Sequence, residues 1–450
     1  MAEIKKILIA NRGEIVQRAV RTIREMGKKS VAIYSAGDKN ASYLKHADEA
    51  ICIGGAKSSE SYLNIPAIIT AAEITGCDAI FPGYGFLSEN QDFVEICKLH
   101  NIKFIGPSVE VMEKMADKSK AKEEMIKAGV PVVPGSKGSV KTLEEGRTIA
   151  REIGYPIMAK AAAGGGGRGM RLIKTEEEFD QNFMAAASEA LAAFGDGTMY
   201  LERFINNPRH IEVQVVGDSH GNAIHIGERD CSLQRRHQKV VEESPAILLN
   251  DETRAKLHEV AVKATKYLKY EGAGTFEFLA DDKQNIYFME MNTRLQVEHP
   301  VSEMVSGIDI VELMIKVAEG EKVPPQESIK FRGHAIECRI TAENPNTFLP
   351  CPGKITQWMV PGGRNVRVDS HIYTGYVVPP YYDSMIGKLI VWGRDRNKAI
   401  NIMKRALAEF EVEGIKTTIP FHKKMMENKD FISNNYDTKY LENYKGLDDL

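Results

Sequence analysis

The sequence lacks long apolar runs, long basic runs and closely spaced cysteines. Its 450 residues are 43% hydrophobic and 27% charged, as in ordinary globular proteins, and the formal net charge is −3. No apolar run approaches the length that spans a bilayer, which argues against a transmembrane helix. Because the basic residues form no long run, binding to nucleic acid or to an anionic membrane is not indicated.

The six cysteines are scattered, and no C-x-x-C pair occurs. This spacing is typical of reduced thiols and indicates neither a zinc site nor a disulfide framework. The apolar stretch before Asn11 is only ILIA, so we predict a first β-strand there and not a signal peptide. Since the sequence shows no targeting signal, we expect a cytoplasmic protein.

The order of predicted strands and helices indicates several domains, as expected for a chain too long for one ordinary core. The N-terminal segments alternate short apolar strands with helices, a βαβ series typical of a doubly wound, Rossmann-like parallel sheet. Residues 108–130 are predicted to be helical, and 251–269 form another predicted helix. The sequence changes character after Pro324–Pro325. We therefore predict an N-terminal domain at 1–107, a central domain at 108–330 with a mobile lid at 132–204, and a C-terminal mixed α+β domain at 331–450.

A glycine-rich loop lies inside the predicted lid. It contains G-x-G-x-x-G as Gly164, Gly166 and Gly169, but a strand-like segment follows, whereas a dinucleotide fingerprint needs a helix there. The G-K-[ST] of a Walker loop is also missing. A glycine hairpin between two strands can fold its backbone N–H groups over phosphates, and Lys160 is placed to meet their charge. The alternative is a surface hairpin with no ligand.

A run of alternating polar residues is the most informative local pattern. The side-chain period of a strand is two, so a strand through this run would carry all of its polar groups on one face. We predict such a strand, in which one end can hold a divalent cation and the other an anion and a base. A solvated sheet face is the alternative. The polar residues are Glu290, Asn292, Arg294, Gln296 and Glu298.

A second acid is predicted to join this face. The segments GTFEFLA and NIYFMEMN are separated by the turn-rich DDKQ and form a predicted antiparallel hairpin. Glu277 interrupts an aromatic run and can lie on the same face as Glu290. With Asn292 these residues supply only oxygen ligands, which suits Mg²⁺ held against nucleotide phosphates. An exposed ion pair on the hairpin is the alternative.

A mixed-charge segment, ERDCSLQRRHQKVVEESP, spans residues 228–245 and contains His237 and Lys239. Such a run is more often a solvated face than a site. His210, just before a strand-like segment, is by itself more often structural. The residues alone leave both readings open.

Seven motifs in this order closely resemble the biotin carboxylase family, the ATP-grasp component of biotin-dependent carboxylases. The resemblance runs from Lys5 to about residue 440. The glycine loop is weak evidence alone, whereas the ordered set is highly specific. The motifs are NRGEI (11–15), PGYGFLSEN (82–90), GGGGRGM (164–170), ERDCSLQRRHQK (228–239), GAGTFEF (272–278), EMNTRLQVEHP (290–300) and PPYYDSMIGKL (379–389).

The resemblance implies an ATP site between the central domain and the lid. It places the Mg²⁺ (or Mn²⁺) ligands at Glu277, Glu290 and Asn292. The implied nucleotide contacts are Lys118, Lys160, Gly165, Gly166, Gly167, Met170, Glu202, Arg203, Ile205, His210, Gln234, His237 and Leu279.

The resemblance also implies a bicarbonate site and the reaction. Glu298 matches the base that deprotonates bicarbonate, and Arg339 matches the group that steadies the biotin enolate. Carboxyphosphate formed from ATP and bicarbonate would then carboxylate biotin. The bicarbonate positions are Lys239, Arg294, Gln296 and Val297, the last through its backbone.

The expected partners follow from the same resemblance. The sequence has no Ala-Met-Lys-Met segment, so biotin should sit on a separate carrier protein or subunit, with a carboxyltransferase subunit completing the complex. A homodimer is the usual assembly. Ala162 and Ala163 replace Ser and Gly of the usual family loop, which predicts a slightly stiffer hinge. Between acetyl-CoA and pyruvate carboxylases, the Ala-Ala-Ala loop favours the pyruvate type.

Three alternatives differ in class. Another ATP-grasp ligase, which activates a carboxylate for amine attack, would share the acids and Asn292 but would not need Arg294, Glu298 and Arg339 together. A nicotinamide-dependent oxidoreductase could use the βαβ domain, but Ser88 stands where its fingerprint requires glycine. A non-catalytic scaffold leaves the ordered polar run unexplained.

Overall fold

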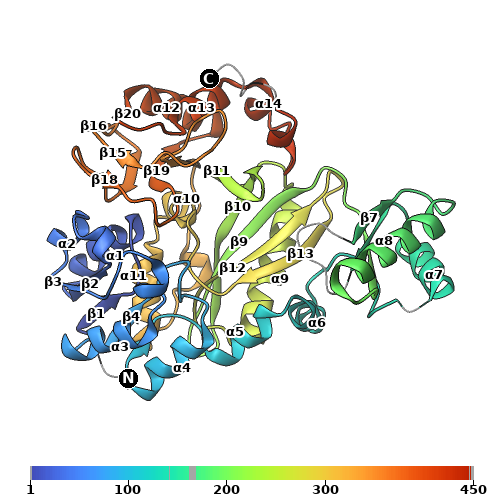
Figure 1. The fold of residues 1–450 in the computed structure, drawn as a ribbon, viewed down its shortest axis with the longest axis horizontal. Coiled ribbons are helices and arrows are strands. Elements are labelled where there is room, and N and C mark those ends of the chain that lie inside the picture. Colours follow the sequence, from blue (N-terminus) through green and yellow to red (C-terminus); the bar gives the residue numbers. More distant parts are fainter. Residues whose placement is uncertain (1–2, 141, 162–168, 445, 447–450) are drawn as a thin grey trace.

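The computed structural model describes residues 3–140, 142–161, 169–444 and 446. Its N-terminal part is a five-stranded parallel sheet in the order β3-β2-β1-β4-β5 (Figure 1). Ile7 and Ile9 of β1 pack in one core with α1, whereas Leu8 packs in another with α3 and α4, so helices cover both faces. The predicted doubly wound sheet is confirmed. The elements are β1 (Lys6–Ile9), α1 (Glu14–Glu25), β2 (Lys29–Tyr34), α2 (Tyr43–His46), β3 (Glu49–Cys52), α3 (Ile65–Ile74), β4 (Ala79–Phe81), α4 (Gln91–Leu99) and β5 (Lys103–Phe104).

The strand order of this sheet reverses between β1 and β4. In doubly wound sheets, ligands usually bind beyond the carboxyl ends of the strands at such a point. Here Asn11, just after β1, donates from its side-chain amide to the carbonyls of Pro82 and Tyr84, both at 2.7 Å. The chain itself therefore bridges the crevice.

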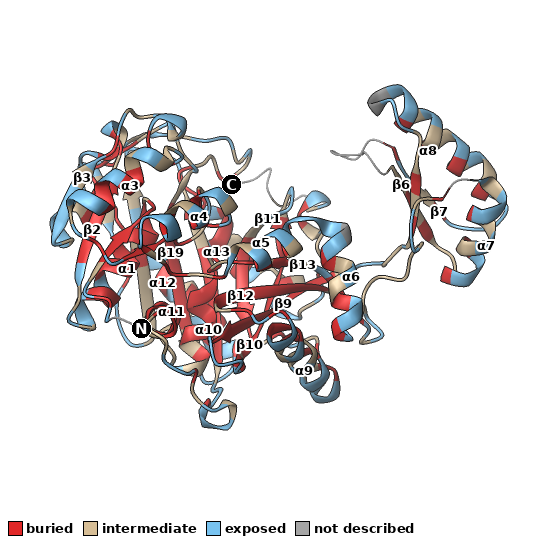
Figure 2. Cartoon of the chain, turned by 90° about the horizontal axis from the view of Figure 1, so that it is seen from below, coloured by how far each residue is buried: buried red, intermediate tan, exposed pale blue. Residues whose placement is uncertain are grey.

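An eight-stranded antiparallel sheet forms the centre of the molecule, in the order β13-β12-β9-β10-β11-β14-β19-β17. It continues across residue 330, because Val241 of β11 pairs with Cys338 of β14. Figure 2 shows its strands as the most continuously buried part of the chain. The strands are β9 (Arg209–Gly217), β10 (Ala223–Arg235), β11 (Gln238–Ser244), β12 (Gly272–Ala280), β13 (Ile286–Asn292), β14 (His334–Thr341), β17 (Val366–Ser370) and β19 (Met385–Gly393).

The predicted helical stretch at 108–130 is two helices, not one. The chain breaks at Asp117, which leaves helical geometry and accepts a hydrogen bond at its side chain from the Lys120 N–H, at 2.9 Å. Asp at this position is a favoured N-cap, which explains the restart. The helices around the sheet are α5 (Val109–Ala116), α6 (Lys118–Ala128), α9 (Asp251–Tyr267), α10 (His299–Ser306) and α11 (Ile310–Ala318).

The predicted strand through the polar run is wrong beyond its first third. β13 ends at Asn292, the next residues form a bend and turn, and α10 begins at His299. Pro300 lies in the first turn of that helix, where a missing N–H costs nothing. Glu298 is thus the N-cap residue of a helix and not a strand residue.

A small unit, residues 132–204, stands apart from the body in Figures 1 and 2 and is called the lid unit below. Its three strands pair in the order β7-β6-β8, and two helices pack with them around a core of their own. The predicted strands on both sides of the glycine loop are confirmed, whereas the loop glycines from Gly164 to Gly167, with Ala162 and Ala163, lie outside the described residues. The elements are α7 (Leu143–Ile153), β6 (Ile157–Ala161), β7 (Met170–Ile173), α8 (Phe179–Phe194) and β8 (Met199–Arg203).

The C-terminal part adds helices and short strands around β14, β17 and β19. Its longest helix is α12 (Arg396–Glu409), which packs on β19 and β14. The other elements are β15 (Gly353–Lys354), β16 (Gln357–Met359), β18 (Val377–Val378), β20 (Glu411–Glu413), α13 (Ile419–Glu427) and α14 (Lys429–Ile432).

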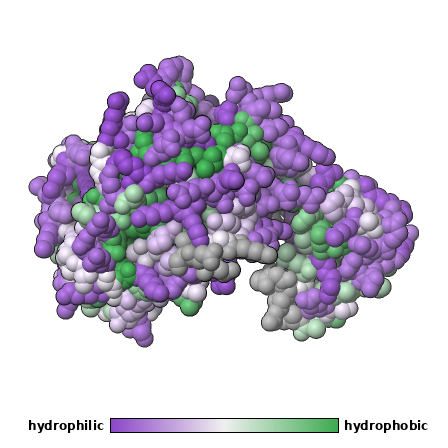
Figure 3. Space-filling view, turned by 90° about the horizontal axis from the view of Figure 1, so that it is seen from above, coloured by the Kyte–Doolittle hydropathy of each residue, from purple (hydrophilic) through white to green (hydrophobic). Residues whose placement is uncertain are grey.

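All six cysteines are free, as predicted, and four of them are buried. Within the described ranges, no helix has both the length and the apolar composition to cross a membrane. Figure 3 shows a mostly hydrophilic face, on which apolar side chains gather in a band on the body and on the side of the lid unit that faces the body.

Candidate active site

A buried ammonium group organises the polar face of the central sheet. Lys239, on β11, contacts one carboxylate from each of three segments. Burial by itself lowers the pKa of this ammonium, but the three carboxylates raise it more, and the pKa lies well above its usual value. Lys239 therefore stays charged. The distances from Nζ are 2.6 Å to Glu212, 2.9 Å to Glu277 and 2.7 Å to Glu298.

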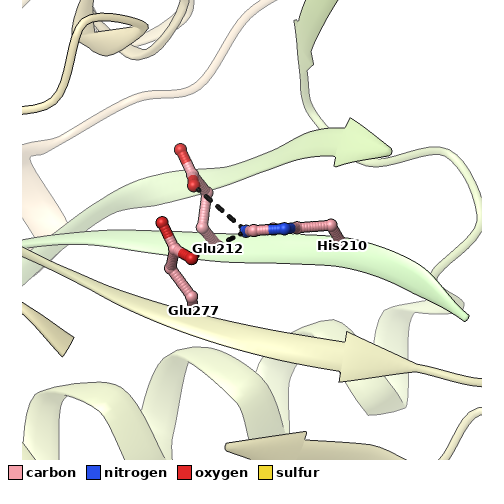
Figure 4. Close-up of side chains that lie close together, drawn as sticks. All are labelled: His210, Glu212 and Glu277. Carbon is pink, nitrogen blue, oxygen red and sulfur yellow. Dashed lines mark ion pairs between the residues drawn. The ribbon is translucent and has the colours of Figure 1, made fainter. Parts of the chain in front are cut away.

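His210 lies between two of these carboxylates (Figure 4). Its Nε2 is 3.1 Å from Glu277 and 3.6 Å from Glu212, and its Nδ1 is 2.9 Å from the Gln234 amide. Burial and Lys239 lower the pKa of His210, but the two carboxylates outweigh them and raise it to about 9. The two carboxylates thus favour the protonated imidazole, whereas the Gln234 amide N–H₂ faces Nδ1 as a donor and favours the neutral ring.

The oxygen ligands predicted for a metal lie together at one end of the β12–β13 hairpin. Glu277 and Glu290 are directly opposite in the register, and the Asn292 amide donates to Glu277 at 2.9 Å. Glu290 and Asn292 also line a cavity of about 290 Å³ with Lys118, whose Nζ is 3.6 Å from Glu290. A set of carboxylate and amide oxygens beside an open space fits Mg²⁺.

Cys231 lies near Glu212 and Glu298, and such a group could in principle hold a metal ion. Burial raises the pKa of the Cys231 thiol well above its usual value, and the thiol stays neutral. We therefore assign no metal ion to this group.

Arg294 connects the loop after β13 to three neighbours. Its guanidinium donates to Glu89 at 2.9 Å, to the side chain of Gln296 at 2.9 Å and to Asn292 at 3.0 Å. Gln296 in turn donates to Glu277 at 3.0 Å. The predicted polar groups therefore do converge, although a loop and not a strand brings them together.

Glu298 is fully buried between two cations. Arg339, on β14, donates to it at 3.0 Å and to Glu242 at 2.5 Å, while Lys239 binds its other oxygen. Burial by itself raises the pKa of the Glu298 carboxyl, but Lys239 and Arg339 lower it more, so the net pKa is below the usual value. The carboxylate is ionised at neutral pH and can accept a proton from a bound acid.

The positions expected to contact a nucleotide fall into two groups. On the body, His210 pairs across the strands with Leu279 and bonds to Gln234. On the lid unit, the Lys160 ammonium is 2.5 Å from the Glu202 carboxylate. Met170 is the first residue of β7, the strand that follows the glycine loop. Arg203 donates to the Ile153 carbonyl within the lid unit, and Ile205 follows the end of β8. His237 lies exposed in the turn between β10 and β11. The remaining predicted contacts, Gly165, Gly166 and Gly167, lie outside the described residues.

Several residues of this site escaped the sequence reasoning. Glu212 is the clearest, because His210, Glu212 and Gln214 alternate with apolar residues on β9 just as the polar residues do on β13. Arg229, fully buried, donates to Glu212 at 2.6 Å. The signal for Glu212 is a charged residue between apolar neighbours in a strand, whereas Arg229 lies between Glu228 and Asp230 on β10 and carried no such signal. Glu89 and Glu242 carried no comparable local signal, whereas Lys388 is the one charged residue of the otherwise apolar strand β19 and shows the same kind of signal.

Three family models match the chain in sequence order. The first is Biotin carboxylase, N-terminal domain, over residues 3–112. The second is Carbamoyl-phosphate synthase L chain, ATP binding domain, over 117–326. The third is Biotin carboxylase C-terminal domain, over 337–443. Together they account for most of the chain.

Individual relatives agree over their full lengths. The biotin carboxylase of Nostoc sp. (strain PCC 7120) is 56% identical over 439 residues, which are 97% of this chain and 98% of that protein. A crystal structure of the biotin carboxylase–β-γ-ATP complex from Campylobacter jejuni is 68% identical, with a TM-score of 0.89, and the match covers 98% of this chain and 99% of that one. The Hydrogenobacter thermophilus 2-oxoglutarate carboxylase biotin carboxylase domain dimer, with MgADP, ADP and bicarbonate, is 49% identical over 100% of both chains, with a TM-score of 0.88. The resemblance seen in the motifs thus holds in sequence and in three dimensions, and the chain belongs to the biotin carboxylase family.

Proposed function

We propose that this chain catalyses the ATP-dependent carboxylation of biotin by bicarbonate, giving carboxybiotin, ADP and phosphate. The observation that carries the proposal is Glu298, a buried and ionised carboxylate held between Lys239 and Arg339 beside a set of oxygen ligands. An ordinary ATP-grasp ligase that activates a carboxylate for amine attack has no use for a buried base at this position. The relatives named above include complexes with ATP analogues and with bicarbonate.

Bicarbonate is a poor nucleophile until it loses its proton. Glu298 is the proposed base, and positioned general bases typically contribute 10²–10⁴-fold to a rate. Arg294, Lys239, the Gln296 amide and the Val297 backbone N–H hold the anion. Asn292 and Gln296 already orient the Arg294 guanidinium, and a bound anion would compete with Glu89 for it.

The nucleotide and its metal belong at the other end of the face. Glu277, Glu290 and Asn292 would hold Mg²⁺ (or Mn²⁺), which when bound neutralises phosphate charge during transfer. Carboxyphosphate is labile, so the proposed role of the lid unit is to exclude water. The residues proposed to bind ATP are Lys118, Lys160, Gly165, Gly166, Gly167, Met170, Glu202, Arg203, Ile205, His210, Gln234, His237 and Leu279.

Arg339 is the proposed support for the negative charge that develops on the ureido oxygen of biotin. Biotin would arrive on a separate carrier protein or subunit, and a carboxyltransferase subunit would select the final acceptor. We also propose a cytoplasmic homodimer, which is supported by the dimer of the Hydrogenobacter relative.

The test is ATP hydrolysis by the purified chain, measured with and without bicarbonate and free biotin. We expect hydrolysis to require bicarbonate and to rise with biotin, and labelled bicarbonate to appear in carboxybiotin. If an amino acid or another amine replaces biotin as the stimulating substrate, the chain is a different ATP-grasp ligase. Hydrolysis that ignores bicarbonate would exclude the proposed reaction.

A further inference from the structure

A buried lysine supports the loop that carries the proposed base. The ammonium of Lys388 donates to the main-chain carbonyl of Val297 at 2.7 Å, and its side chain has no exposed surface. Lys388 is the direct cross-strand neighbour of Arg339. Lys388 therefore lies beside Arg339, which donates to Glu298, and it bonds to Val297, which directly precedes Glu298.

Glu14 supplies the counter-charge for Lys388. The two side chains are 3.2 Å apart, and Glu14 is the first residue of α1, where the helix dipole favours a carboxylate. The hydroxyl of Tyr84 also donates to Glu14. The pair thus fills the crevice at the strand-order reversal of the N-terminal sheet, where related sheets usually bind a ligand.

Two other carboxyl groups lie near Lys388, those of Asp369 and Glu337. Asp369 is held by a two-pronged contact with Arg367, at 2.9 and 2.7 Å. Both oxygens of Glu337 are buried without a hydrogen-bond partner among the described residues. Burial, reinforced by Glu242, raises the pKa of the Glu337 carboxyl well above its usual value, so it stays neutral. Burial also raises the pKa of the Glu14 carboxyl, but Lys388 opposes that rise, and Glu14 is the carboxyl whose oxygen lies 3.2 Å from the Lys388 ammonium.

We propose that Lys388 is a positioning residue, which fixes the Val297 backbone and the Glu298 side chain for bicarbonate, and that Glu14 fixes Lys388. The proposal rests on the proposed function, because it needs Val297 and Glu298 to face bicarbonate. It also gives the N-terminal domain a definite role in the reaction. Glu14 and Tyr84, beside the strand-order reversal of that domain, would then support a substrate loop of another domain.

The decisive variant is the double substitution Glu14→Gln with Lys388→Met. Lys388→Met alone would leave a buried carboxylate without its cation, which is strongly destabilising, whereas the double variant keeps the charge balanced. We expect a cooperative thermal transition, a KM for bicarbonate raised about tenfold or more, and a KM for ATP within about twofold of the wild type.

Lys28→Met is the matched control. Lys28 also donates to a main-chain carbonyl, that of Ile4 at 2.7 Å, and pairs with Glu319 at 2.6 Å, so its bonds lie away from the 293–298 loop. We expect this variant to melt at a lower temperature with an unchanged KM for bicarbonate. If the double variant folds and its KM for bicarbonate and its kcat match those of the wild type, the proposal is wrong.

Two further measurements keep the proposal testable. If the double variant does not fold, Glu14→Gln alone should still raise the KM for bicarbonate about threefold, and no change would count against Glu14. If the wild type shows no bicarbonate-dependent hydrolysis, the proposed function fails. Positioning is then read from hydrogen exchange of a peptide containing Val297 and Glu298, which the double variant should accelerate and Lys28→Met should not; equal exchange would reject the support itself.

Discussion

Glu298 shows how a single buried carboxylate can be kept reactive. Its burial alone would favour the protonated form, but the charges of Lys239 and Arg339 reverse that preference. The same two contacts point its oxygens in different directions, because each cation binds a different one. Ionisation and a fixed position are two of the conditions for a general base, and a bound anion that draws Lys239 or Arg339 away from Glu298 would raise its pKa and its basicity.

The first prediction concerns Glu298→Gln. The amide keeps the shape but cannot take a proton, so we expect bicarbonate-dependent hydrolysis to fall about a hundredfold or more. Binding of a non-hydrolysable ATP analogue, followed by calorimetry, should be retained, because Glu298 lies at the bicarbonate end of the face. Turnover close to that of the wild type would refute the assignment of the base.

The second prediction concerns Glu290→Gln. Glu290 is more exposed than Glu277, and the Lys118 ammonium lies 3.6 Å from its carboxylate. Removing its charge should weaken the metal, so a several-fold higher Mg²⁺ concentration should be needed for half-maximal hydrolysis. Asp282→Asn, an exposed acid in the turn of the same hairpin, is the control and should leave the Mg²⁺ requirement unchanged. An unaltered requirement in Glu290→Gln would remove Glu290 from the ligand set.

At the scale of elements, the sequence predicted the type of most segments but not where each one ends. The alternation from Glu290 to Glu298 looks like one strand, because it has the period of a strand throughout. Beyond Asn292, however, the polar side chains hydrogen-bond to each other and do not form one solvent-facing side of a strand. Arg294, for example, donates to Gln296. Pro300 is the local signal that a helix begins here, because proline is favoured in the first turn of a helix. Tertiary contacts decided the rest.

The third prediction concerns the contact between β10 and α9. Glu228, on β10, accepts from Arg254 at 2.8 Å and contacts His258 at 2.7 Å, and both partners lie on α9. Burial by itself raises the pKa of the Glu228 carboxyl, but His258 and Arg254 outweigh it and lower the pKa to about 2. A lowered pKa means that the ionised form stabilises the fold at neutral pH, and that this stabilisation is lost as the pH falls from about 4.5 toward 2.

Glu228→Gln should therefore lower the free energy of unfolding by about 3 kcal/mol at pH 7. The difference in unfolding free energy between variant and wild type should shrink as the pH falls below about 4.5. Its slope with pH should approach about 1.4 kcal/mol per pH unit. Urea unfolding at pH 7, 5 and 4 measures it. Glu259→Gln, an exposed acid on the same helix, should change little at any pH. A difference that does not vary with pH would contradict the assigned role of Glu228.

At the scale of the whole molecule, the site depends on contacts that no local pattern reveals. Lys388 and Val297 are 91 residues apart in the sequence, and Glu14 lies in a different domain from both. Lys388 is the one charged residue of an otherwise apolar strand, which marks it as unusual, but only the folded chain shows that it contacts Val297 and Glu14. The alternation of polar residues predicted a polar face for a cation, an anion and a base. Only the resemblance to a family identified the anion as bicarbonate. The boundaries predicted at residues 107 and 330 remain predictions, and the central sheet continues across the second.

The last prediction concerns the lid unit, residues 132–204. It has its own core, and its link to the body includes a bridge of Val132 with Phe288 and an ion pair of Glu202 with Lys122, at 3.2 Å. A partly exposed ion pair contributes little stability, so this link can yield to a stronger partner. Lys160 pairs with the same Glu202, and phosphate oxygens would compete for its ammonium.

We therefore expect the lid unit to close when a non-hydrolysable ATP analogue binds with Mg²⁺. Small-angle scattering should show a radius of gyration smaller by on the order of 1 Å than that of the nucleotide-free protein; one compact chain of this length has roughly 22 Å, and the proposed homodimer has a larger value. The matched control is the same nucleotide with a chelator, which should produce less closure because the phosphate charge is not neutralised. An unchanged radius of gyration at saturating nucleotide and Mg²⁺ would show that water is excluded in some other way, since an open lid unit leaves carboxyphosphate exposed to hydrolysis.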